Sequence, residues 1–346
     1  MSKVEGKSLH DEFYSRQIIL KELGRKGQKK LAESKVAIVG LGGLGTASSL
    51  YLALTGVGHL RLIDQDTVES HNLHRQVLYS PEDLRYPKVE ASAKRLSKIN
   101  PLVNVEAIPE NLNAGNVEKL LSGMNCVVDG LDNMRTRYLV SRACVKLKMP
   151  YVFGAAIGME GNLSVFASPE TPCLECVFPN IDDTNLLTCD VRGVLGVTPG
   201  IIGTMQAMET IKILADVGSV LKSKLMICDF NDMYFAIIDI FKRENCQACQ
   251  GTIVFPRAQE KLVWLCGRNT ANINPEKPLK LDLDEVYATI KRYFKVRIRS
   301  SLAVIFDYKS FEISLFNGGR MLIKNVDNEK SALEVYRQVL QKLGIS

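Results

Sequence analysis

A predicted strand, a glycine-rich loop and a predicted helix follow one another between residues 35 and 57, and they constrain the fold more than any other stretch. The apolar run 35–39 predicts a buried strand, and residues 46–57, rich in Ala and Leu, predict the helix. The loop between them, Gly40-Leu-Gly-Gly-Leu-Gly45, fits the pattern G-x-G-x-x-G. Glycines permit a tight turn and let backbone N–H groups approach a phosphate, which the positive end of the helix dipole stabilises.

An acidic residue follows where a nucleotide-binding unit needs one. The next predicted strand ends in Asp64, about 20 residues beyond the glycines, where a carboxylate can accept hydrogen bonds from a ribose. The glycines alone are a weak signal, because a purely structural turn also explains them. Together with the strand, the helix and the acid they predict a nucleotide site that includes Gly40, Gly42, Gly43, Gly45 and Asp64.

Composition and charge limit the class of protein. With 346 residues, 46% hydrophobic and 24% charged, the chain has room for one large globular domain and a smaller one. The net charge of +6 is mild and its charges are interspersed, which argues against a nucleic-acid binder and suits an acidic protein partner. No apolar run could span a membrane and no secretory signal is present, so we expect a cytoplasmic protein with no membrane partner.

The order of predicted elements gives the fold class. Strands and helices alternate as far as residue 155, which predicts a Rossmann-like α/β fold with a mainly parallel sheet covered on both faces. Residues 225–230 and 234–241 predict antiparallel additions. We expect residues 1–251 to form the first domain, with an N-terminal helical segment and a zinc-bound segment, and residues 252–346 a small C-terminal α+β domain.

Two C-x-x-C pairs predict a metal site. Cys173 and Cys176 form the first pair, and Cys246 and Cys249 the second. Four thiolates supplied by two tight turns can hold Zn²⁺ tetrahedrally, which leaves no open position for catalysis. A redox pair is the competing interpretation, but neither pair begins a helix after a strand in a thioredoxin-like unit. We therefore predict structural zinc and a reducing compartment.

The remaining chemistry-bearing residues distinguish between nucleotides. A dinucleotide dehydrogenase needs the glycine loop and the acid but not a group of cations. Cations with a carboxylate for Mg²⁺ stabilise charge on a polyphosphate during transfer, which favours ATP over NAD. A solvated connection is the alternative for the loop 67–88. The predicted ligands of ATP and Mg²⁺ follow the second and fourth predicted strands: Asp66, Asn72, Arg75, Gln76, Lys88, Asp132 and Asn133.

These motifs together resemble the ubiquitin-activating-enzyme-like adenylyltransferases, a family that includes the bacterial MoeB and ThiF proteins and archaeal relatives. The resemblance covers about residues 10 to 250. Besides the glycine loop and the cysteine pairs, it rests on these segments: Phe13-Tyr-Ser-Arg-Gln-Ile-Ile-Leu20, Leu62-Ile-Asp-Gln-Asp-Thr-Val68, Asn72-Leu-His-Arg-Gln76, Pro87-Lys88 and Asp129-Gly-Leu-Asp-Asn133.

The resemblance implies an activity and residue roles. In that family, the C-terminal glycine of a ubiquitin-fold carrier attacks the α-phosphate of ATP, giving an acyl-adenylate and pyrophosphate. It implies that Gly42 lies under the phosphates, that Asp64 binds the ribose, and that Asp132 holds Mg²⁺. Arg16 would reach into the neighbouring subunit's site, which makes a homodimer necessary. The phosphates would be stabilised by Asn72, Arg75, Gln76 and Lys88.

Cys189 and the C-terminal tail leave alternatives open. Cys189 matches the cysteine of the family's crossover loop, which forms a thioester with the carrier in some members and serves sulfur transfer or is dispensable in others. Adenylation of sulfur carriers without a thioester is therefore the alternative, and an NAD-dependent oxidoreductase or a non-catalytic scaffold are more distant ones. The tail lacks a rhodanese-type cysteine loop; we expect it to dock the carrier or a downstream conjugating protein, or to act as a stabilising appendage.

Overall fold

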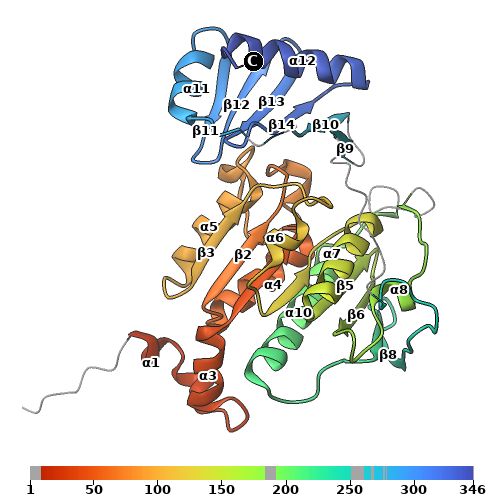
Figure 1. Cartoon of the computed structure of the whole chain (residues 1–346). Coiled ribbons are helices and arrows are strands. Elements are labelled where there is room, and N and C mark those ends of the chain that lie inside the picture. The colour runs from red at the N-terminus through yellow and green to blue at the C-terminus, as the bar shows by residue number, and fades with distance from the viewer. Residues whose placement is uncertain are drawn as a thin grey trace, which may run out of the picture.

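The computed structural model describes residues 9–183, 192–250, 261–265, 269–275, 277 and 279–345. Two sheets organise these residues, one in each of two layered units (Figure 1). The expected boundary between the two domains falls in residues 251–260, outside the described residues. None of the described helices is both long enough and apolar enough to cross a membrane.

The first sheet has eight strands, and their order and directions confirm the predicted α/β class. The first five in spatial order are parallel, and the last three add to them in antiparallel fashion. In that order the strands are β3 (Asn104–Ile108), β2 (His59–Ile63), β1 (Lys35–Val39), β4 (Cys126–Asp129), β5 (Tyr151–Ile157), β6 (Glu160–Phe166), β7 (Lys224–Asp229) and β8 (Tyr234–Asp239).

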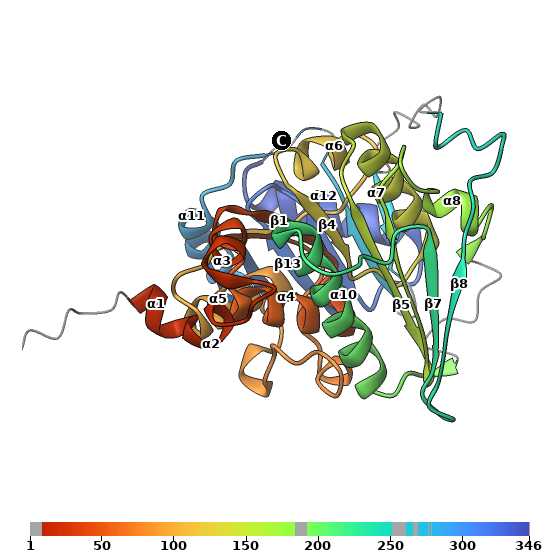
Figure 2. The ribbon, with the colours of Figure 1, turned by 90° about the horizontal axis from the view of Figure 1, so that it is seen from below.

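Helices cover both faces of this sheet (Figure 2). One face carries α3 (Gly24–Glu33), α4 (Gly43–Thr55), α5 (Lys88–Ile99) and α10 (Val197–Ala215); the other carries α6 (Val117–Leu121), α7 (Met134–Leu147) and α8 (Leu174–Val177). Successive side chains of a strand point to opposite faces. Accordingly Val36 and Ile38 of β1 join one hydrophobic core, while Ala37 and Val39 join the other.

Short helices begin the described chain and connect its larger elements. α1 (Leu9–Phe13) and α2 (Ser15–Ile18) precede α3, and two 3₁₀ turns, η1 (Ser70–Asn72) and η2 (Pro81–Asp83), lie in the polar segment between β2 and α5. Tyr14 anchors the N-terminal segment, because it is buried and its hydroxyl accepts a 2.7 Å hydrogen bond from Asn100 Nδ2.

The second sheet confirms the expected small α+β unit. Its six antiparallel strands are, in spatial order, β11 (Lys295–Arg299), β12 (Ala303–Tyr308), β13 (Phe311–Phe316), β14 (Met321–Lys324), β10 (Thr270–Ile273) and β9 (Leu262–Trp264). α11 (Leu283–Ile290) and α12 (Glu329–Lys342) pack on one face. The opposite face is turned toward the carboxyl ends of β2 and β3 (Figure 1).

Candidate active site and cysteine cluster

The glycine loop joins β1 to α4 in a turn that only glycines allow. Gly40 has a φ of +88°, in the left-handed region that favours glycine. A Cβ on Gly45 would lie 1.9 Å from the carbonyl oxygen of Gly40, and one on Gly130 would lie 2.1 Å from the same atom. The backbones that follow β1 and β4 are therefore in direct contact, and Gly42 precedes the first turn of α4 with its free N–H groups.

Asp64 ties the end of β2 to this loop. One carboxylate oxygen accepts a 2.6 Å hydrogen bond from Leu41 N, and the other accepts a 2.7 Å bond from Asp66 N. Burial raises the pKa of Asp64, and the positive charge of Lys88 opposes that shift. The acid predicted from the sequence thus lies beside the glycine loop, at the strand end where open α/β sheets bind ligands.

Lys88 is held against the same acids. Its side chain is 7% exposed, and its Nζ lies 3.0 Å from Asp66 Oδ2. Burial alone would lower the pKa of Lys88, but the carboxylates of Asp66 and Asp64 raise it above its ordinary value, so the lysine stays charged. Tyr79 adds a contact that the sequence did not indicate, because its hydroxyl donates to the carbonyl oxygen of Leu41 at 3.2 Å.

Three further predicted residues lie on the segment after β2. Asn72 is buried and its Oδ1 accepts a 3.0 Å hydrogen bond from Arg75 Nη2. A Cβ on Gly43 would lie 3.3 Å from the carbonyl oxygen of Arg75, so this segment runs beside the glycine loop. Gln76 is buried, and its Oε1 has no hydrogen-bond partner among the described residues. Such an orphaned oxygen is consistent with a polar ligand at this position.

An ion pair fixes the loop at the end of β4. Asp129 is fully buried, and it accepts hydrogen bonds from Arg137 Nε at 3.1 Å and from the Tyr151 hydroxyl at 2.7 Å. Arg137 also donates to the carbonyl oxygen of Leu131 at 2.6 Å. Arg137 was not predicted from the sequence; an arginine eight residues after a buried strand-end acid was the available signal.

Asp132 and Asn133 follow in that loop. Asp132 is exposed, and Asn133 Nδ2 donates a 3.1 Å hydrogen bond to its Oδ1. Asn133 Oδ1 accepts a 2.9 Å bond from Thr136 N and so caps the first turn of α7. Because β1 pairs with both β2 and β4, Asp64 and Asp132 flank the glycine loop on its two sides.

One predicted catalytic residue lies apart from this group, and another falls outside the described residues. Arg16 lies exposed on α2 and makes no side-chain hydrogen bond or ion pair within the described part of the chain. Cys189 lies in 184–191, outside the described residues. Both roles remain predictions.

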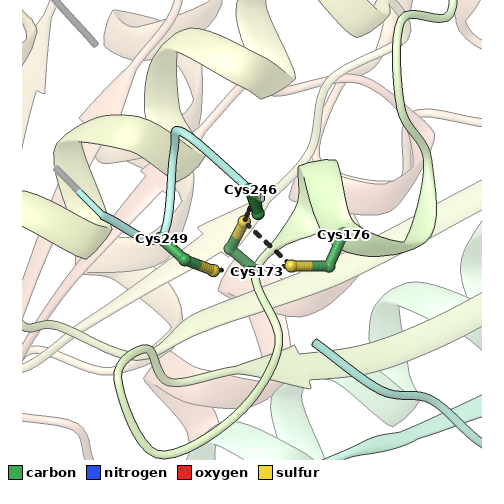
Figure 3. A group of neighbouring side chains, drawn as sticks. All are labelled: Cys173, Cys176, Cys246 and Cys249. Carbon is green, nitrogen blue, oxygen red and sulfur yellow. Dashed lines mark hydrogen bonds between the residues drawn. The ribbon is translucent and has the colours of Figure 1, made fainter. Parts of the chain in front are cut away.

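The two cysteine pairs converge in one cluster (Figure 3). The Sγ atoms of Cys173 and Cys246 lie 3.6 Å apart, those of Cys176 and Cys249 lie 3.4 Å apart, and all four lie within 4.8 Å of one another. Zinc–sulfur bonds of about 2.3 Å in a tetrahedron place sulfurs roughly 3.8 Å apart. The four thiols therefore fit Zn²⁺, which would supply a structural cross-link and no catalytic position.

A comparison with protein families decides the family. The ThiF family profile matches residues 14–250, more than half of the chain. The chain belongs to the ThiF family. This agrees with the resemblance expected from the sequence motifs, and it accounts for the combination of a parallel sheet, a glycine loop and a cysteine cluster.

Similar proteins add detail on relatives of this ThiF-family chain. It is 42% identical over 238 residues to the "Adenylyltransferase and sulfurtransferase MOCS3" of Culex quinquefasciatus, covering 68% of this chain but 54% of that protein. It is 39% identical over 242 residues to the "Sulfur carrier protein adenylyltransferase" of Thermus thermophilus, covering 68% of this chain and 89% of that one. The chain thus spans about half the length of that MOCS3 relative.

Solved structures agree on the fold. The structure of Escherichia coli MccB with ATP has a TM-score of 0.58 and 25% identity, covering 65% of this chain and 69% of that one. The likeness covers about two thirds of this ThiF-family chain.

Proposed function

We propose that this protein is an ATP-dependent adenylyltransferase that activates the C-terminal glycine of a ubiquitin-like or sulfur-carrier protein. The arrangement of Asp64, Lys88 and Arg75 beside the glycine loop supports this function most directly. It provides a ribose acceptor and two cations at the carboxyl end of a parallel sheet. The names of two relatives in the family, both adenylyltransferases, point the same way.

The proposed reaction balances as a substitution at phosphorus. A carboxylate oxygen of the carrier's last glycine forms a bond to the α-phosphorus, and the bond to the bridging oxygen of pyrophosphate breaks. Lys88 and Arg75 neutralise charge that accumulates on the phosphates, and Asn72 holds the Arg75 guanidinium in place. Asp132 would hold Mg²⁺, which supplies further charge neutralisation. The remaining proposed ligands are Gly40, Gly42, Gly43, Gly45, Asp66, Gln76 and Asn133.

Two groups of exposed apolar side chains are candidate contact surfaces for the protein partners in this proposal. The edge strand β8 exposes Phe235, Ile237 and Ile238, and we propose that the carrier docks there. Near Arg16, the side chains of Phe13 and Ile19 are exposed as well. We propose that this N-terminal segment joins two copies and brings Arg16 to the neighbouring site.

Thioester transfer to Cys189 is a finer proposal that rests on the family resemblance alone. Adenylation of sulfur carriers without a thioester is the second candidate, and the printed names of the relatives favour it. Incubation with ATP and carrier separates the two, because a thiol-sensitive adduct that disappears in Cys189→Ala supports transfer and its absence supports the second candidate. We also propose zinc at the cysteine cluster and a reducing, cytoplasmic setting; the seven cysteines that the structure describes are all unbridged.

Exchange of labelled pyrophosphate into ATP tests the main proposal. We expect exchange that depends on a ubiquitin-like carrier and falls at least about 100-fold in Arg75→Ala and in Asp132→Ala. Arg95→Ala is the matched control, because Arg95 is an exposed arginine on α5. Unchanged exchange in both site variants, in folded protein, would contradict the proposed roles and favour a scaffold; hydride transfer to a nicotinamide would favour an oxidoreductase.

A further inference from the structure

The C-terminal sheet rests on the segments that carry the proposed nucleotide site. Leu302 packs against the hydrophobic core of the first domain, and directional polar contacts surround this apolar one. Four of the first-domain partners in these polar contacts lie within three residues of a proposed nucleotide ligand, namely Asp64, Asp66, Asn72 or Lys88. The fifth first-domain partner, Pro109, follows β3. The pairs are Gln65–Asn272 at 3.3 Å, Glu69–Lys324 at 3.1 Å, Arg85–Glu312 at 2.8 Å, Glu90–Ser301 at 2.9 Å and Pro109–Arg320 at 3.1 Å.

Arg320 is the unusual member of this interface. It lies in the turn between β13 and β14 and is 4% exposed. Its Nε donates to the carbonyl oxygen of Pro109, its Nη1 donates to Asn272 Oδ1 at 3.1 Å, and its Nη2 has no hydrogen-bond partner among the described residues. A buried cation bonded to neutral acceptors is costly unless other charges compensate it.

The compensating charges come from the first domain, and two of the three belong to the proposed nucleotide site. Burial lowers the pKa of Arg320, while the carboxylates of Glu110, Asp66 and Asp64 oppose that shift. These acids belong to the other domain, and the second cation near Asp64 and Asp66 is Lys88. The attraction between Arg320 and the acids therefore acts across the interface at the edge of the sheet where the ribose is expected.

We propose that the C-terminal domain is part of the nucleotide site, with Arg320 as a positioning residue that favours ATP binding. This inference rests on the proposed adenylyltransferase function. The Arg320 charge offsets repulsion between Asp64, Asp66 and the incoming anionic nucleotide. The hydrogen bond from Asn272 to Gln65 fixes the residue between the two acids. This assigns the domain a role in binding ATP, in addition to any role in docking proteins.

Steady-state kinetics and direct binding test Arg320→Ala in the full-length chain. We expect the KM for ATP and the Kd of an ATP analogue with a non-cleavable α,β bond to rise about tenfold, while kcat changes less than about twofold. Arg337→Ala is the matched control, because Arg337 is exposed on α12, on the face of the sheet opposite the interface, and its Nε donates to the carbonyl oxygen of Leu333 in the same helix. It should leave all three values unchanged.

Two milder variants keep the test valid if Arg320→Ala does not fold. Arg320→Lys retains the charge and should recover most of the ATP affinity, and Gln65→Ala should weaken ATP binding from the other side of the interface. Unchanged KM and Kd in a folded Arg320 variant would overturn the proposal, as would a rise in the KM for the carrier alone. Analogue binding is measured without a carrier, so a failure of the adenylation chemistry itself is seen separately.

Discussion

At the scale of single residues, buried charges determine the shape of the site. Asp129 has no exposure to solvent. Burial raises the pKa of its carboxyl group, and the charge of Arg137 and the hydrogen bond from Tyr151 oppose that shift. The same arginine donates to two backbone carbonyls, those of Leu131 and Gly154. One ion pair thus connects β4, β5 and the loop that carries Asp132.

Removing one partner of this pair tests its structural role. We expect Arg137→Met to lower the free energy of unfolding by about 3 kcal/mol, because it leaves the Asp129 carboxylate buried without its cation. Urea denaturation at pH 7 gives the value. Arg142→Met on the same helix is the control and should cost less, since Arg142 and its partner Glu175 are more exposed. A larger cost for the control would contradict this account.

At the scale of elements, the cysteine cluster connects two segments that are far apart in sequence. One pair begins α8, and the other follows β8 near the end of the first domain. Burial and the neighbouring sulfurs raise the pKa of the Cys173 thiol. A bound cation reverses that preference, because it stabilises thiolates. A bound zinc ion would therefore stabilise the cluster by bonding to all four sulfurs.

Metal analysis tests the cluster directly. We expect about one zinc per chain in purified protein, and its loss in Cys246→Ser with a fall in Tm of roughly 5 °C or more. Cys228→Ser is the control: Cys228 is a buried cysteine of β7 outside the cluster, and the variant should keep its zinc. Zinc content that is unchanged in Cys246→Ser would exclude this site.

Most elements near the site could be predicted from the sequence. β1 spans the predicted residues, and α4 differs from its predicted bounds by a few residues, since buried apolar runs and helical periodicity are strong local signals. β9, β10 and β11 were not predicted, because they are short or polar and their strand conformation depends on partners that follow later in the chain.

Within the site, the local motifs predicted Asp64, Lys88 and Asn72, but contacts between distant residues were not predictable. Arg320 lies 211 residues from Pro109, whose carbonyl it binds. No spacing rule connects such positions, because only the docking of two separate sheets brings them together. Tyr79 was not predicted for a related reason. Its hydroxyl contacts the glycine loop at Leu41, and only the tertiary fold brings these two residues together.

At the scale of the whole molecule, the two units are joined by charged and polar contacts. The ion pair between Arg85 and Glu312 crosses the interface, and Lys324 contacts both Glu312 and Glu69. Burial raises the pKa of Glu312, but the charge of Lys324 and the hydrogen bond from Arg85 lower it below its ordinary value. Because the charged form of Glu312 makes these ion pairs, the contact between the two units depends on pH.

The sign of that dependence follows from the lowered pKa of Glu312. The stabilisation is present above the unfolded-state pKa and disappears as the pH falls through the folded-state value. We expect Glu312→Gln to lower the free energy of unfolding by about 1 kcal/mol at pH 7. The difference should shrink as the pH falls below the ordinary pKa of a glutamate, measured by urea denaturation across that range. A difference that persists at acid pH would contradict the assignment.

The central claim is that the protein joins AMP to the terminal carboxylate of a carrier protein. The most direct measurement follows the label from ATP labelled in the α-phosphate, with mass spectrometry of the carrier after a short incubation. We predict AMP on the carrier's last glycine and one pyrophosphate released for each adenylate formed. Release of ADP with phosphate on the carrier, or an unlabelled carrier beside folded, ATP-bound protein, would contradict the account.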